Sequence, residues 1–242
     1  MMTRGVWLAA TMAALFVAGC GGGAGNTLVV SRKVPIGNGT GRVEVLKDGG
    51  EVESVTIRLT PEALQGLPNA MTEFSIPIPP EAGTIFDHVG IDWNPMGHEP
   101  PGIYDAPHFD FHYYLLTQAQ RDEIVPGSPK FDTPPAQGAA PAGYIAPGPG
   151  GVPRMGAHWI DPTSGEFNGQ PFGATFIFGF WDGKLAFVEP MVTRSFLQAG
   201  TSWQKTIPAP SVVPKHGWYP TKATVGRDGA DTVLVLSDMV QR

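Results

Sequence analysis

The sequence predicts an all-β fold, a sandwich or barrel of antiparallel strands with a few short helices and long loops rich in proline and glycine. Three observations lead to this prediction. The 242 residues include 32 glycines and 25 prolines, which favour turns over long helices. Hydrophobic residues reach 42%, enough to build a core. The strand-like runs are short and are separated by Asp-Gly turn signals, as in sandwiches and barrels.

Three β-hairpins are predicted from alternating or apolar runs joined by Asp-Gly. Residues 42–60 alternate apolar and polar side chains around "DGG". Residues 173–192, "GATFIFGFWDGKLAFVEPMV", are two aromatic-rich runs joined by Asp182-Gly183, and their apolar character predicts a place in the middle of a sheet. The last hairpin turns at Asp228-Gly229.

The remaining elements are shorter. Residues 73–80 contain three prolines and predict an edge strand, because proline cannot donate a ladder hydrogen bond. Residues 85–95 predict a strand that ends in an Asn-Pro turn, and "PHFDFHYYLL" (107–116) predicts another. A short helix is expected over 117–124, and one helical turn before Gly200.

Residues 126–153 form a segment rich in proline, glycine and alanine that is not expected to form regular structure. It is either a linker between two domains or a long loop within one. We favour the loop, because long loops often form the rims of sites and the flanking segments share one chemistry. The prediction is therefore a single β-rich domain over residues 41–242.

The N-terminus has the layout of a secretory signal over residues 1–19, with Arg4 followed by an apolar run too short to span a membrane comfortably. The ending "VAGC" resembles the lipobox of bacterial lipoproteins, which predicts lipidation of Cys20. Residues 20–40 then form a flexible tether that begins with "GGGAGN". We expect a lipid-anchored protein of the cell envelope, on the outer side of the cytoplasmic membrane or in the outer membrane facing the periplasm.

Charge and cysteine content limit the partners. The formal net charge is −6 and no cluster of lysine and arginine occurs, which argues against nucleic acid as a partner. The single cysteine excludes a disulfide within the chain. The expected membrane contact is the lipid anchor. Self-assembly into a homo-oligomer through exposed β edges is also compatible with the sequence.

The stretch "HEPPGIYDAPHFDFHYYLL" (98–116) has the most chemical content. In a strand, His108, Asp110 and His112 share one face while the aromatic residues between them share the other. The α carbons of the two histidines would be about 13 Å apart, so both can hardly bind one ion. Asp110 with one of the two histidines, about 6.6 Å away, suits a shared metal ion.

Other ligands would have to come from elsewhere in the chain. His158, in "MGAHWID", and Glu189, at the end of an apolar strand, are the main candidates, because a buried carboxylate is costly unless it is paired or bound to a metal. His98 and Glu99 are secondary candidates, expected first as rim residues. Imidazole with carboxylate suits a divalent transition metal, whose identity the sequence leaves open.

Two functions remain open on these observations. One is a metal-binding domain, with or without catalysis by a metal-bound water or an open iron or copper site. The other is a non-catalytic envelope protein that binds a partner or self-assembles, with the same histidines and acids forming a structural hydrogen-bond network.

The segments "WNPMGHEPPGIYDAPHFDFHYYLL", "MGAHWID", "FWDGKLAFVEPM" and "WYPTKATV" resemble the TTHB-type (DUF5602-like) family of secreted bacterial proteins of unknown function. The resemblance covers residue 40 to the end and implies one β-rich domain. It implies no reaction. The histidine-bearing strand is also similar to those of cupins, but cupins have His-x-His, and here Asp110 follows two residues after His108.

Overall fold

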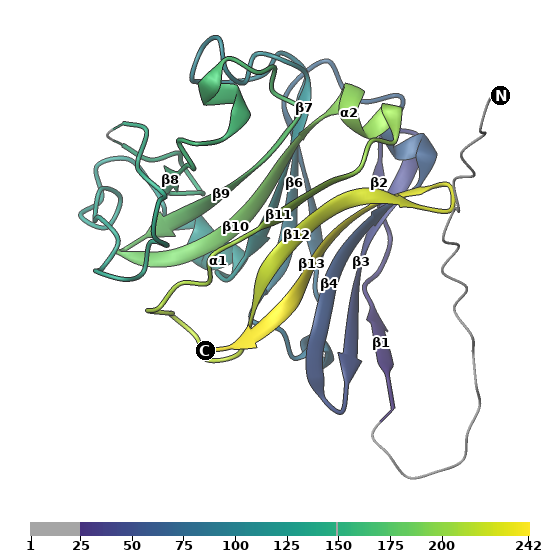
Figure 1. The fold of residues 1–242 in the computed structure, drawn as a ribbon, viewed down its shortest axis with the longest axis horizontal. Helices are drawn as coiled ribbons and strands as arrows, with labels where there is room; N and C mark the ends of the chain where they lie inside the picture. Colours follow the sequence, from purple (N-terminus) through teal and green to yellow (C-terminus); the bar gives the residue numbers. More distant parts are fainter. Residues whose placement is uncertain (1–24, 149) are drawn as a thin grey trace, which may run out of the picture.

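The computed structural model describes residues 25–148 and 150–242, which fold into two packed antiparallel sheets (Figure 1). The sheets form a sandwich and not a closed barrel, so of the two predicted architectures the sandwich is observed and the cupin-like barrel is not. The predicted signal sequence and Cys20 lie outside the described residues. None of the helices in the described part of the chain has the length and apolar character needed to cross a membrane.

The first sheet contains, in spatial order, β1 (Thr27–Val30), β3 (Gly39–Asp48), β4 (Glu51–Leu59), β13 (Asp231–Gln241), β12 (Trp218–Asp228) and β11 (Trp203–Thr206), with β2 (Val34–Ile36) also paired to β3. The second sheet contains β5 (Thr72–Pro77), β6 (His88–Asn94), β7 (His108–Tyr114), β10 (Lys184–Thr193), β9 (Ala174–Trp181) and β8 (Ala157–Trp159). The helices are η1 (Pro61–Leu64), η2 (Pro80–Ala82), α1 (Gln118–Asp122), η3 (Gly165–Asn168) and α2 (Arg194–Ala199).

The predicted hairpins are confirmed as β3–β4, β9–β10 and β12–β13. Asp182 and Gly183 both adopt positive φ, as a tight hairpin turn requires. The proline-containing strand β5 lies at the edge of the second sheet, while β9 and β10 lie inside it. The short helix before residue 124 begins with a capping box formed by Thr117 and Gln120.

One boundary of the predicted tether is wrong. Residues 27–30 and 34–36 form β1 and β2, which both pair with β3. β-branched residues dominate "TLVV", and the exposed edge of β3 offers ladder partners for them. The glycine-rich sequence ends before residue 27. Because residues 27–30 and 34–36 pair with β3, the folded domain begins before residue 41.

Strand β7 separates the hydrophobic core from a second, polar layer. Phe109, Phe111 and Tyr113 point into the core between the sheets, where the Tyr113 hydroxyl donates to the Leu234 carbonyl of β13 at 3.1 Å. His108, Asp110 and His112 alternate with them and therefore lie on the opposite face, which we call the outer face of the second sheet. Both faces of β7 are buried, because every residue of this strand is buried.

Loops cover the outer face. The segments between β7 and β9 gather beside β8 and β9, on the side away from the first sheet (Figure 1). The proline- and glycine-rich segment contributes to this cover, because Phe131 packs with Tyr114 and Phe187. Its described residues, 126–148 and 150–153, contain no helix or named strand, as expected of a loop.

Gly179 in β9 makes room for this layer. It lies opposite His158 of β8, and a Cβ at this position would overlap the ring of Phe187. The Phe187 ring in turn contacts His112 and His158, with centroid distances of 4.8 and 5.3 Å.

We expect Gly179→Ala to destabilise the protein by about 1–3 kcal/mol, because the added methyl group overpacks the outer layer. Urea denaturation measures the change. Gly226→Ala is the matched control, since its Cβ would meet only Ser202 Oγ at 3.8 Å. Equal stability of the two variants would contradict the role given to Gly179.

Candidate functional site

Polar side chains from strands β6, β7, β10 and β8 meet on the outer face of the second sheet. Asp92 of β6 lies directly opposite Asp110 of β7 in the strand pairing. Glu189 comes from β10 and His158 from the edge strand β8. Such a concentration of buried histidines and acids is costly unless each charge has a partner.

Two residues of β7 and one loop residue form what we call the first triplet: His98, His108 and Asp110. His98 comes from the loop after β6, and its Nε2 lies 3.3 Å from Oδ2 of Asp110. Nε2 of His108 lies 3.1 Å from the other oxygen, Oδ1. Asn94 donates to Oδ2 at 2.7 Å and so holds the carboxylate in place.

The protonation of both histidines in the first triplet follows from their other contacts. Nδ1 of His98 lies 2.7 Å from the Glu99 carbonyl oxygen, and Nδ1 of His108 lies 2.7 Å from that of Ala106. A carbonyl oxygen only accepts, so each Nδ1 carries the proton. The neutral ring then presents a bare Nε2 lone pair to a carboxylate, which is repulsive unless a proton or a metal ion lies between them.

The second triplet consists of His112, His158 and Glu189. Oε2 of Glu189 lies 3.4 Å from Nε2 of His112 and 3.9 Å from Nε2 of His158. On the other side of the His112 ring, Oδ2 of Asp92 lies 3.3 Å from Nδ1. The His112 ring is thus held between two carboxyl groups and stacks on Tyr114.

Burial and charge shift the pKa values of the two triplets differently. Burial opposes ionisation of Asp110, but the neighbouring imidazoles of His108 and His98 outweigh it and hold the pKa of Asp110 well below its ordinary value. Burial also acts against the charged form of His98, but the hydrogen bond to Asp110 has the larger effect and raises the pKa of His98. The first triplet therefore retains charge.

In the second triplet, burial dominates. It lowers the pKa of His112 to about 3 and that of His158 to about 4. Burial and the nearby charges of Asp110 and Asp92 raise the pKa of Glu189 well above its ordinary value. Burial and Asp110 raise the pKa of Asp92 to about 8. Without a cation, this half of the site is uncharged near neutral pH.

Several buried polar atoms of the site have no hydrogen-bond partner among the described residues. They are His108 Nε2, Asp110 Oδ1, both ring nitrogens of His112, Asp92 Oδ2 and Glu189 Oε2. Native structures leave few such atoms, and each calls for an explanation such as a bound ion or water. Within each triplet, an unpaired imidazole nitrogen faces an unpaired carboxylate oxygen. One kind of ligand, bound between such atoms, explains both triplets.

Two histidines connect the site to solvent. The side chain of His98 is 35% exposed and that of His158 is 20% exposed, whereas Asp110 and Glu189 are almost completely buried. Aromatic rings of Tyr104 and Phe172 pack against His98 and His108 and close the rest of the first triplet. A ligand would reach the site past the two exposed histidines.

The structure brings together the five main residues expected from the sequence and adds one of the two secondary ones. Asp110 faces His108 and not His112, which agrees with the expected division of the strand histidines. His98, expected at the rim, reaches Asp110 directly. Glu99 is exposed and contributes its backbone carbonyl to His98.

Four neighbouring residues were missed: Asp92, Asn94, Tyr104 and Glu166. The Tyr104 hydroxyl and one Glu166 oxygen are buried without partners in the described chain. Asp92 carried a usable signal, because an acid two residues after Gly90 in an apolar strand shares the face of His88. Asn94, two residues further along β6, shares that face by the same alternation. Tyr104 and Glu166 depend on loop positions that strand periodicity does not predict.

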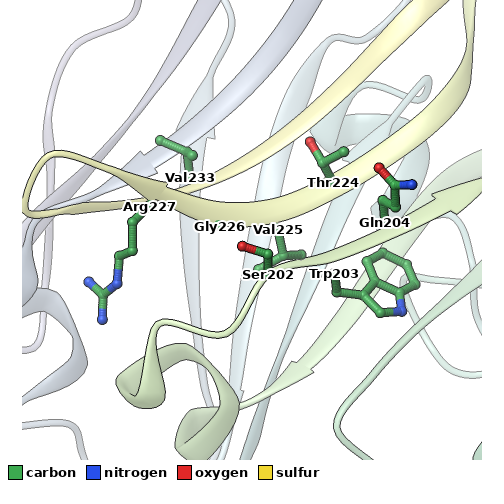
Figure 2. Close-up of a pocket in the computed structure, with 8 residues that line it drawn as sticks. All are labelled: Ser202, Trp203, Gln204, Thr224, Val225, Gly226, Arg227 and Val233. Carbon is green, nitrogen blue, oxygen red and sulfur yellow. The ribbon is translucent and has the colours of Figure 1, made fainter. Parts of the chain in front are cut away.

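A shallow pocket of about 350 Å³ lies elsewhere, on β11 and β12 of the first sheet (Figure 2). Its lining includes Trp203, Thr224 and Arg227 but no acid, histidine or cysteine. The Arg227 guanidinium donates to the Leu197 carbonyl at 2.8 Å, so it already has a structural partner. The pocket therefore adds no chemistry to the site on the second sheet.

Fold and site together define a β-sandwich with a buried histidine and carboxylate cluster. Residues 48–93 match the family model TTHB210-like, described as Hypothetical protein TTHB210. This match confirms the resemblance to a TTHB-type domain for a segment of about a fifth of the chain, from the end of β3 to β6, and it includes Asp92. No curated protein and no solved structure gives a significant match.

We expect Asp110→Asn to reduce the stability of the metal-free protein most between about pH 4 and 6.5. Asp110 has a lowered pKa when folded, so its contribution is present above its unfolded pKa and is lost in acid. His98 has a raised pKa, so its contribution is present below about pH 6.5 and is lost as pH rises through the folded pKa.

Urea denaturation of chelator-treated protein from pH 4 to 9 measures this difference. The gap between the wild-type protein and the variant should shrink as the pH rises through the raised pKa of His98, where this histidine loses its proton. A stability difference that stays constant from pH 5 to 9 would show that the ion pair between His98 and Asp110 does not contribute to the stability of the wild-type protein.

Proposed function

We propose that the outer face of the second sheet binds a divalent transition metal, in a domain anchored to the cell envelope through lipidated Cys20. One observation carries the metal proposal: each triplet supplies two imidazole nitrogens and one carboxylate oxygen that lie within 4.8 Å of one another and are largely buried. In the first triplet both Nε2 atoms are left free by Nδ1 contacts to backbone carbonyls. This backbone support is typical of metal-binding histidines.

The spacing of the atoms also suits a metal. Two ligand atoms bound 2.0–2.1 Å from one tetrahedral ion lie roughly 3.3 Å apart. The two histidine contacts to Asp110, one to each carboxylate oxygen, measure 3.1 and 3.3 Å, and the His112 contact to Glu189 measures 3.4 Å. The His158 contact, at 3.9 Å, is longer and needs a small movement of its exposed side chain.

The donor set indicates which ions fit and what they could do. Two histidines with one carboxylate suit Zn²⁺ and Fe²⁺, and three protein ligands leave at least one coordination position open. A water in that position would become more acidic and a better nucleophile. The domain is therefore suited to a reactive metal centre as well as to storage or transfer of the ion.

The anchor is supported by sequence alone. "VAGC" places small residues before the only cysteine of the chain, and the first strand of the domain begins at Thr27, a few residues after Cys20. Two or more acyl chains on that cysteine would hold the domain at a membrane surface stably. The folded domain would then lie outside the cytoplasm.

Protein purified without an affinity tag should contain a transition metal in stoichiometric amount, measured by elemental analysis. His108→Ala and His158→Ala should each lose metal, while His216→Ala, at an exposed histidine, should not. At a free metal concentration 100 times the Kd, the unfolding free energy should rise by about 2.7 kcal/mol.

Absence of metal, with both site variants folded and equally stable, would contradict the metal proposal. It would favour the alternative function, an envelope protein whose histidines and acids form a structural network.

Full-length protein expressed in bacteria should incorporate radiolabelled palmitate and fractionate with membranes. Cys20→Ser should abolish both, because the thiol accepts the lipid. The described residues of the β-domain begin at residue 25, so we expect the stability of the domain to be unchanged in the variant. Membrane association of Cys20→Ser equal to that of the wild-type protein would refute the lipid anchor.

A further inference from the structure

We infer that the six residues of the two triplets hold two metal ions, one in each triplet. This inference rests on the proposed function and specifies it. No residue belongs to both triplets, and each triplet has the same composition of two histidines and one carboxylate. The site would therefore be a pair of similar centres side by side on one face of a sheet.

One ion cannot serve both triplets. Asp110 and His112 are successive residues on the same face of β7, with α carbons about 6.6 Å apart. The two strand histidines point their Nε2 atoms at different carboxylates, His108 at Asp110 and His112 at Glu189. An ion that binds one pair at about 2 Å is too far from the other pair to bind it as well.

Each triplet also has its own supporting contacts. In the first, Asn94 and the carbonyls of Glu99 and Ala106 orient the three ligands. In the second, Oδ2 of Asp92 lies 3.3 Å from the far nitrogen of His112. Support of this kind orients a ligand and fixes its tautomer. Separate neighbouring contacts for each triplet fit two binding sites better than one site beside a chance cluster.

Solvent reaches the triplets separately. His98 belongs to the loop after β6, and His158 belongs to the three-residue edge strand β8. Each triplet thus has one partly exposed histidine of its own. The two ions would nevertheless interact, because the carboxylates of Asp92 and Asp110 lie opposite each other on neighbouring strands.

Isothermal titration calorimetry with Zn²⁺, on untagged protein stripped with a chelator, tests the inference. The wild-type protein should bind two equivalents. Asp110→Asn and Glu189→Gln should each bind one, and the double variant should bind none. Both replacements keep side-chain size and change a carboxyl ligand to an amide, so they disturb the packing least. His216→Ala should still bind two.

The outcomes separate the inference from the function on which it rests. If the wild-type protein binds one equivalent of zinc, the two-ion inference is overturned. The metal proposal still holds if this one ion is lost in Asp110→Asn, in Glu189→Gln or in both. No binding in the wild-type protein overturns both. Two equivalents that survive in the double variant place the ions elsewhere and overturn both as well.

A second measurement needs no variant. Co²⁺ added to the wild-type protein should produce ligand-field absorption that grows until two equivalents are bound. Growth that stops at one equivalent would overturn the two-ion inference even if a variant fails to fold.

Discussion

The buried carboxylate of Asp110 sets the main electrostatic constraint on this domain. A charge in that position is tolerated only if its neighbours compensate it. His98, His108 and Asn94 all turn a nitrogen towards Asp110, and they come from a loop and two strands. The backbone carbonyls that take the Nδ1 protons then leave the two imidazoles ready to share a cation with this carboxylate.

Strand β7 links that polar site to the stability of the fold. Its alternate residues build the core between the sheets, so the core fixes the position and direction of His108, Asp110 and His112. Sites on regular elements hold their geometry more closely than sites on loops. The cost is that the outer face must be covered, and the long segments between β7 and β9 do this with aromatic side chains such as Phe131 and Phe172.

Sequence periodicity predicted those parts of the structure that depend on local pattern. The hairpins, the edge position of β5 and the common face of the three polar residues of β7 all follow from alternation and turn chemistry. His98 was underrated because its reach to Asp110 depends on the path of a proline-rich loop. Asp92 was missed because its role depends on pairing across strands. The sequence predicts a tether where β1 forms, because glycines precede this segment and β1 pairs with β3 across the intervening strand β2.

A crystal structure of zinc-loaded protein, with anomalous diffraction recorded at the zinc edge, tests the central claim most directly. The account predicts an anomalous peak about 2.0–2.2 Å from the Nε2 atoms of His98 and His108 and from an Asp110 oxygen. Absence of anomalous density at both triplets, with the histidines hydrogen-bonded directly to the carboxylates, would contradict it.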